Sequence, residues 1–436
     1  MTTLRQKSDI SFALWIPLIW YAIVASRFVG RWMKMGSLDL TEVNYLEGNP
    51  IDKVVFSALI IIGIFILLRR KDVEWSNVLR VNAWIFILFL YMGLSILWSD
   101  FMMVSLKRWI RATGALVMVL VVLTESNPLE AISTLFRRCF YVHIPLSIIF
   151  IKYYRTIGVG WDYLGNESWL GVTTHKNHLG QIVMTSGIFF IWSIIRTWNK
   201  WGMEWIIYLS YLLMSLFLLN GSRSKSSGTS LFVFFAGIVM LIVLHLMRRN
   251  LKQIQRNILI SIFVTAFFFL IFQFAIESFV QRPLVSLAVE ASGHDETFTG
   301  RTYLWMDVLK IASHHPIVGV GYGSFWIGDL SNNLWEKYAW KPQQGHNGYI
   351  DVYVELGLIG VCLLIIAIYF AYKNIMKTIV LDFEYGRFTI IFLTMILIHN
   401  ITETSFLRST HNLWFLLLLV SVKIPGNSQF NNSIRI

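Results

Sequence analysis

Long apolar segments recur along the whole chain, and they constrain the fold more than any other feature. An α-helix needs roughly 20 apolar residues to cross a lipid bilayer, and helices satisfy their own backbone groups where no water is available. The sequence therefore predicts an all-α, polytopic membrane protein with about twelve spanning helices. These helices are expected near 11–30, 52–68, 82–98, 109–123, 136–152, 176–195, 203–220, 227–247, 257–276, 348–370, 388–406 and 411–424.

The composition agrees with this interpretation and excludes a soluble multidomain protein. Of the 436 residues, 56% are hydrophobic and 14% are charged, against roughly 25% charged residues in soluble domains. The net charge of +12 suits a protein that handles anionic lipids or phosphates, or one with basic cytoplasmic loops. Cys139 and Cys362 lie in apolar segments, so no disulfide framework is expected. No nucleic-acid module or cleavable signal peptide is evident.

Three regions are predicted along the chain. Residues 1–170 form N-terminal transmembrane helices, residues 171–424 form a second transmembrane region, and residues 425–436 form a cytoplasmic tail. The second region contains a long hydrophilic loop at 277–347, and loops of this length are usually functional. Basic residues are slightly more frequent on the side of the two termini. Because basic loops stay on the cytoplasmic side, this favours termini inside the cell and a long loop that faces outward.

The loop has a pattern of its own. Residues 302–313 read as a short amphipathic helix, and residues 316–323 read as a turn-rich stretch. Trp305 and three further tryptophans give the loop aromatic faces. Such faces stack on sugars, although the same residues also form membrane-interface belts.

His346 is placed at a membrane–water boundary, because the polar loop ends there and a long apolar segment follows. An imidazole in that position is a candidate general base, and the alternative is an interfacial histidine that is only hydrogen-bonded. On a continuous helix Tyr349 would share its face, whereas Asp351 and Glu355 would form a pair on another face. Glu355 would lie about 13 Å into the membrane, so it needs a cationic partner.

Arginines on the same predicted side form a second candidate group. Arg223 and Lys225 lie in a very short connection between two helices, and Arg301 lies in the loop. Arg27 and Arg111 are expected near the same level. A guanidinium offers a planar fork of donors that suits phosphate oxygens, so such a set can hold a diphosphate without a metal. The alternative is snorkelling or interhelical pairing.

Two polar segments interrupt the apolar pattern. His175 and Lys176 lie where a spanning helix begins, and Thr174 is predicted to cap that helix. The His-Lys-Asn-His cluster there lacks the spacing of a metal site, and a simple polar helix start is the alternative. Glu403 lies inside a predicted apolar helix, where an ionisable residue is functional or structurally paired, and Arg408 follows on the outer side.

The order of these motifs resembles the bacterial O-antigen ligase and polymerase superfamily, whose shared region is the Wzy_C domain. The segment from His346 to Gly360 is similar to its His-(Asn/Ser)-x-x-(Leu/Ile)-x-x-x-x-Glu-x-Gly-x-x-Gly pattern. The segments 300–305 and 315–325 resemble its large periplasmic loop, and 222–224 resembles its arginine-bearing turn. Residues 174–180 look more like the exopolysaccharide polymerase (ExoQ-like) branch than like ligases.

This resemblance implies a GT-C-type membrane glycosyltransferase that needs no metal or other cofactor. Its donors are glycans linked to undecaprenyl diphosphate. His346 matches the family's essential histidine, and Arg223 and Arg301 match its essential arginines. Ser224-Lys225 stands where Arg-Thr-Ala is more common in the family, and this departure affects how the arginine-bearing turn aligns with the family pattern. Around the diphosphate and glycan we expect His175, Lys176, Arg27, Arg111, Lys225, Glu403, Arg408, Trp305 and Tyr349.

The predicted function is polymerisation of undecaprenyl-diphosphate-linked oligosaccharide repeat units into exopolysaccharide or O-antigen. Transfer of glycan to lipid A-core by an O-antigen ligase is the first alternative. A transporter or flippase of the same lipid-linked glycan, or a scaffold for export, are the others. The resemblance implies the bacterial inner membrane, an active site that faces the periplasm, and a chain-length regulator and export machinery as partners.

Overall fold

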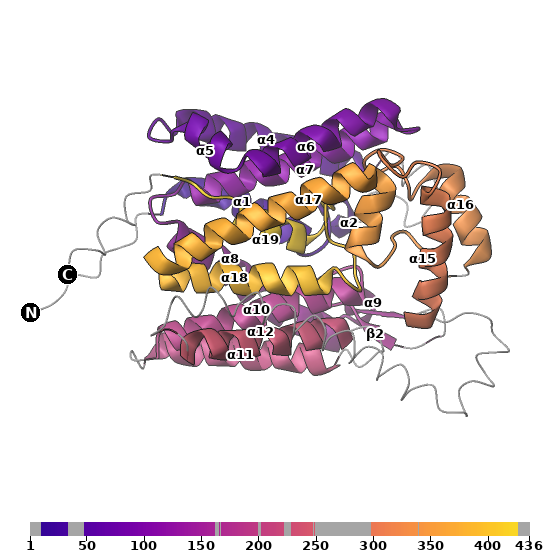
Figure 1. Ribbon diagram of the computed structural model, residues 1–436. Coiled ribbons are helices and arrows are strands. Elements are labelled where there is room, and N and C mark those ends of the chain that lie inside the picture. The colour runs from indigo at the N-terminus through magenta and orange to yellow at the C-terminus, as the bar shows by residue number, and fades with distance from the viewer. Residues whose placement is uncertain are drawn as a thin grey trace, which may run out of the picture.

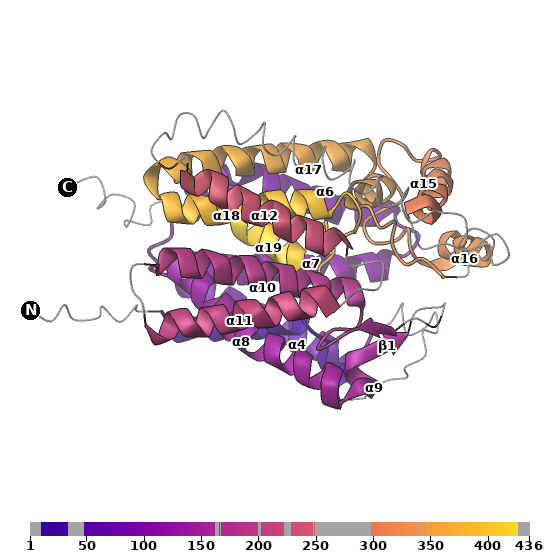
Figure 2. The same cartoon turned by 90° about the horizontal axis from the view of Figure 1, so that it is seen from below.

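The computed structural model describes residues 10–33, 48–161, 165, 167–198, 202–221, 228–246, 248, 298–338 and 340–425. Most of the long helices lie side by side in one bundle, and α15 and α16 gather at one end of it (Figure 1). A two-stranded antiparallel sheet lies at the same end, with Val159 of β1 opposite Trp169 of β2 (Figure 2).

The first part of the chain is helical with one strand at its end. Its elements are η1 Phe12–Leu14, α1 Trp15–Val24, α2 Val29–Trp32, α4 Pro50–Arg69, α5 Trp75–Val81, α6 Ala83–Leu94, η2 Ser95–Trp98, α7 Met102–Leu123, α8 Pro128–Tyr153, α9 Arg155–Gly158 and β1 Val159–Trp161.

The second part begins with the other strand and is otherwise helical. Its elements are β2 Glu167–Trp169, α10 Lys176–Arg196, α11 Met203–Gly221, α12 Gly228–Leu246, α15 Phe298–Ala312, α16 Gly328–Lys337, α17 Gly348–Leu381, α18 Phe383–His399 and α19 Asn412–Ser421.

The helices agree with a polytopic membrane protein. Predicted span 257–276 lies outside the described residues, and each other predicted span overlaps a helix. Within the described ranges, five helices are long and apolar enough to cross a membrane, or six if the bent pair Trp75–Val81 and Ala83–Trp98 is one span. The number twelve for the whole chain stays a prediction.

The centre of the bundle is formed by α10, α18 and α19. In the most apolar 18-residue stretch of α10, 83% is buried inside the protein, against 28% in the corresponding stretch of α4. All ten residues of α19 are buried. Helix α10 buries polar residues such as Gln181 and Ser186 as well as apolar ones, whereas α4 presents exposed apolar residues suited to lipid.

Helix α17 contains a break that joins it to the loop before it. Gly357 has φ +66°, and a Cβ there would overlap the carbonyl oxygen of Ile317. The turn-rich stretch runs through this break, because Leu358 N donates to Pro316 O and Gly321 N donates to Glu355 O, both at 2.9 Å. The predicted stretch 316–323 is thus confirmed as non-helical, and its backbone replaces hydrogen bonds that α17 loses.

The predicted helix 388–406 is wrong at its C-terminal end. Helix α18 begins earlier, at Phe383, and ends at His399. The Asn400 side chain explains the stop, because its Oδ1 accepts hydrogen bonds from Ser405 N at 2.9 Å and Phe406 N at 3.0 Å. A side chain that satisfies backbone donors in this way competes with helix formation. Glu403 therefore lies in a connection between α18 and α19.

Candidate functional site

His346 lies immediately outside α17. Asn347 is the N-cap of that helix, and its side chain accepts hydrogen bonds from Tyr349 N and Ile350 N at 3.0 and 3.1 Å. His346 itself has φ +49°, a conformation that is uncommon outside glycine. The expectation that Tyr349 shares its helix face is therefore wrong, because His346 is not in the helix.

Glu403 is the residue that brings the site together. Its Oε2 lies 3.1 Å from His346 Nδ1, and its Oε1 lies 3.1 Å from an Arg301 guanidinium nitrogen. Asn177 Nδ2, at the start of α10, donates to the same Oε1 at 2.7 Å. One buried carboxylate thus joins residues from α10, α15 and the segment before α17. The sequence indicated Glu403 as a substrate contact, not as the shared partner of His346 and Arg301.

The electrostatics of Glu403 favour its ionised form. Burial by itself would raise the pKa of the Glu403 carboxyl, but the interactions with His346 and Arg301 outweigh it. Together they hold the pKa of this carboxyl well below its usual range. At neutral pH the carboxylate is therefore a fixed negative charge between a histidine and an arginine.

Helix α15 confirms the predicted amphipathic helix and contributes two contacts. Arg301 donates to the carbonyl of Thr402 at 2.6 Å, which adds to its pairing with Glu403. One turn later, Trp305 Nε1 donates to Gly345 O at 2.6 Å. The aromatic ring of Trp340 lies 5.6 Å from the His346 ring, measured between centroids. The loop therefore holds the residue before His346 and covers its imidazole.

The polar start of α10 lies beside the same carboxylate. The predicted cap Thr174 is wrong, because His175 is the N-cap and its Nδ1 accepts from Asn177 N at 3.2 Å. Burial, with the nearby His178, lowers the pKa of His175 to about 3, so its imidazole is neutral. Lys176 is buried at this helix start. Among the described residues, no group of His, Cys, Asp or Glu side chains is arranged to hold a metal ion.

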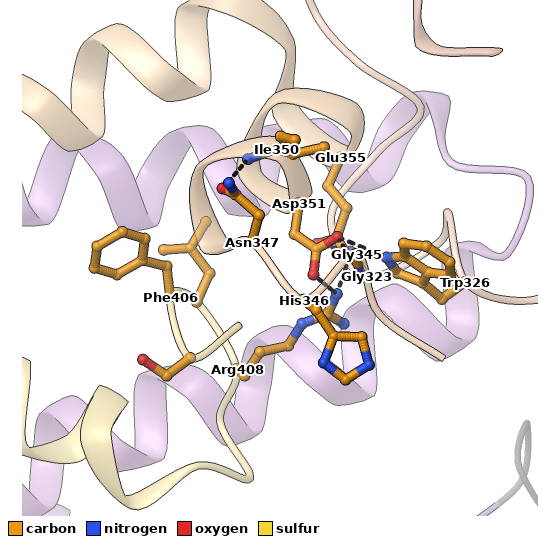
Figure 3. Close-up of polar contacts among 12 residues, drawn as sticks. Gly323, Trp326, Gly345, His346, Asn347, Ile350, Asp351, Glu355, Phe406 and Arg408 are labelled. Carbon is orange, nitrogen blue, oxygen red and sulfur yellow. Dashed lines mark hydrogen bonds and ion pairs between the residues drawn. The ribbon is translucent and has the colours of Figure 1, made fainter. Parts of the chain in front are cut away.

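A second charged cluster lies directly behind His346 (Figure 3). Arg408 lies 3.2 Å from Asp351 Oδ2 and 3.2 Å from Glu355 Oε1. The cationic partner expected for Glu355 is therefore Arg408. Both acids pair with Arg408, and no hydrogen bond joins either of them to the His346 imidazole in the described residues.

Several predicted contacts lie elsewhere. Arg27 donates to Thr173 O at 2.9 Å, and Arg111 lies over the rings of Phe28 and Phe56. The Tyr349 hydroxyl donates to Leu397 O at 3.1 Å on α18. Arg27 thus holds the backbone before α10, Arg111 and Tyr349 contact neighbouring segments, and no contact between these three side chains and Glu403 is found in the described residues. Arg223 and Lys225 lie outside the described residues.

Comparison with known proteins shows similarity to one family and to one of its relatives. Residues 209–365 match the family model for O-antigen ligase. The chain is also similar to the exopolysaccharide production protein ExoQ of Rhizobium meliloti (strain 1021), with 28% identity over 317 residues. That alignment covers 70% of this chain and 68% of ExoQ. Helices α12, α15 and α16 and parts of α11 and α17 fall within the matched family region, as does His346. The chain is therefore similar to the O-antigen ligase family over residues 209–365 and to ExoQ over most of its length.

Proposed function

We propose that this protein is a glycosyltransferase of the bacterial inner membrane that polymerises undecaprenyl-diphosphate-linked repeat units. The product is an exopolysaccharide or O-antigen chain, formed with inversion and without a metal. The site faces the periplasm in this proposal. The observation that carries it is the meeting of His346 and Arg301 on one buried carboxylate, Glu403.

The proposed base is His346. With Nδ1 donating its hydrogen to Glu403 Oε2, the other ring nitrogen, Nε2, is left to accept a proton. Nε2 takes the proton of an acceptor sugar hydroxyl, and the hydroxyl oxygen forms a bond to the anomeric carbon of the donor. The bond between that carbon and the diphosphate oxygen breaks, and its electron pair leaves with undecaprenyl diphosphate. Attack opposite the leaving group inverts the anomeric centre.

The proposed electrophilic partners are arginines. Arg301 keeps two contacts, to Glu403 and to the carbonyl of Thr402, and a guanidinium has five N–H donors, so donors remain for phosphate oxygens. Arg223 is proposed to join it from the connection between α11 and α12. Preorganised donors aimed at developing charge contribute strongly to catalysis. Trp305 and Trp340 flank the site and offer faces on which a sugar can stack.

Polymerase is favoured over ligase because the similarity to ExoQ, a protein of exopolysaccharide production, spans most of this chain. The ligase alternative rests on the family model itself. The two differ in acceptor: a polymerase extends a lipid-linked glycan, whereas a ligase transfers the glycan to lipid A-core. A chain-length regulator and export machinery remain predicted partners.

The test is an elongation assay. Purified protein in detergent or proteoliposomes receives lipid-linked repeat units, and glycan length is followed on a gel. His346→Ala is expected to abolish elongation. His314→Ala is the matched control, because this loop histidine is exposed and is expected to leave elongation unchanged.

Three outcomes would overturn the proposal. Elongation by His346→Ala at the rate of the unmodified protein would remove the base. Transfer to lipid A-core without any elongation would make the protein a ligase. Movement of the lipid-linked substrate across the bilayer by His346→Ala, with no elongation by any variant, would favour the transporter alternative.

A further inference from the structure

The backbone of His346 is held from both sides by groups other than the proposed base and arginines. On the N-terminal side, Gly345 N donates to Asp351 Oδ1 at 2.9 Å, and Gly345 O accepts from Trp305. On the C-terminal side, Gly348 N donates to the carbonyl of Asn400 at 2.8 Å. These contacts hold His346 in its left-handed conformation, which is unfavourable for a residue other than glycine.

Asp351 is the centre of this arrangement. Its Oδ1 accepts from Gly345 N and from Trp326 Nε1 at 3.0 Å, and its Oδ2 faces Arg408 (Figure 3). One turn further along α17, Glu355 Oε2 accepts from Gly323 N at 2.9 Å, and its Oε1 faces the same arginine. Arg408 therefore holds together two acids that between them bind three points of the outer loop.

We propose that Arg408, Asp351 and Glu355 form a positioning network for His346, and that Arg408 acts on the reaction through His346 instead of binding the donor diphosphate. This inference rests on the function proposed above. It replaces the expectation from the sequence that Arg408 is a substrate contact.

Charge and geometry support the distinction from Arg301. Arg408 faces two buried carboxyl groups, Asp351 and Glu355, so its guanidinium is already paired with protein acids. A diphosphate brought to Arg408 would have to compete with the Asp351 and Glu355 carboxyl groups that already contact the guanidinium. Arg301, in contrast, faces one carboxylate that it shares with His346.

The first test separates positioning from diphosphate binding by kinetics. Arg408→Gln is expected to lower kcat for elongation about 10- to 100-fold, because a misplacement near 1 Å costs rates of that order. The KM for the lipid-linked donor is expected to stay unchanged. A raised donor KM with an unchanged kcat would assign Arg408 to the diphosphate and overturn the inference.

The second test is a rescue. Arg408→Gln leaves both Asp351 and Glu355 without their cation, and the added substitution Glu355→Gln removes one of the two charges. The double variant is expected to recover part of the lost kcat. If Arg408 instead binds the diphosphate, no recovery is expected, because Glu355→Gln restores no cation. A double variant with no recovered kcat would therefore also overturn the inference.

A third readout does not depend on activity. Hydrogen exchange of the backbone amides at 345–350 is expected to accelerate in Arg408→Gln, with exchange in the central helix α10 unchanged. Equal exchange at 345–350 in both proteins would count against the network. Asp307→Asn is the matched control, since this loop acid accepts from Tyr338 at 2.6 Å and does not contact the His346 segment.

Should Arg408→Gln not be recovered folded, Asp351 offers a second route. Asp351→Asn keeps an oxygen for Gly345 N and Trp326, whereas Asp351→Ala removes it. Positioning predicts that Asp351→Asn retains more kcat than Asp351→Ala, and equal values would refute it. An inactive His346→Ala with full activity of all network variants would overturn this inference alone. Full activity of His346→Ala would instead overturn the proposed function.

Discussion

The substitution Glu403→Gln is the most direct perturbation of the proposed site. Glutamine keeps the length and shape of the side chain and an oxygen that can accept from Asn177 and Arg301. It replaces the negative charge with an amide group, and that group would face His346 Nδ1 across a contact of 3.1 Å. An amide donor there favours the tautomer with hydrogen on Nε2, so Nε2 can no longer accept a proton.

The expected magnitude follows from the contacts. Glu403 makes two hydrogen bonds to charged or chargeable groups, His346 and Arg301. Such bonds contribute about 1.5–3 kcal/mol each. Loss of the oriented bond to His346 alone therefore predicts a decrease in kcat of about 10- to 100-fold, since 1.4 kcal/mol corresponds to a factor of ten.

The assay is the elongation reaction with lipid-linked repeat units, with thermal unfolding in detergent measured in parallel. Folded Glu403→Gln with reduced kcat supports the role of the carboxylate. Asn177→Ala is a useful comparison, because it removes a neutral contact to the same Oε1 and keeps the charge. It is expected to reduce kcat less than Glu403→Gln. Folded Glu403→Gln with the kcat of the unmodified protein would refute the reasoning.

Three further predictions follow from single features. Gly357→Ala is expected to lower the unfolding temperature more than Gly165→Ala, because both glycines have positive φ but only Gly357 has a neighbour that a Cβ would overlap; equal decreases would contradict this. Ionised Glu403 has a depressed pKa in the folded protein, so the stability difference between the unmodified protein and Glu403→Gln should be constant above about pH 5 and shrink as the pH falls further; a difference that grows on acidification would contradict the sign. Elongation is expected to survive EDTA treatment, because arginines are proposed to stabilise the diphosphate; loss of activity that Mg²⁺ restores would require a metal.

The sequence by itself determined the class of the protein and much of its layout. Apolar length is a local property, so each predicted span within the described residues overlaps a helix, but several ends were misplaced: α17 runs on to Leu381 and α7 begins already at Met102. The glycine-rich stretch before α16 was evident as a turn, because glycine content is also a local property. Gly357 in α17 was evident as a position of the family motif. The position of His346 at a helix start followed from the change between a polar and an apolar segment.

Only the tertiary structure decided which groups meet. His346 and Glu403 are 57 residues apart in sequence, and their contact depends on how α17 packs against the connection after α18. Apolar periodicity also could not show that Asn400 ends α18, because a side chain that binds backbone donors overrides a favourable helical pattern. The same packing turned Arg408 toward Asp351 and Glu355. Composition can supply charges at a membrane surface, but the pairing of buried charges depends on distances that only the folded chain sets.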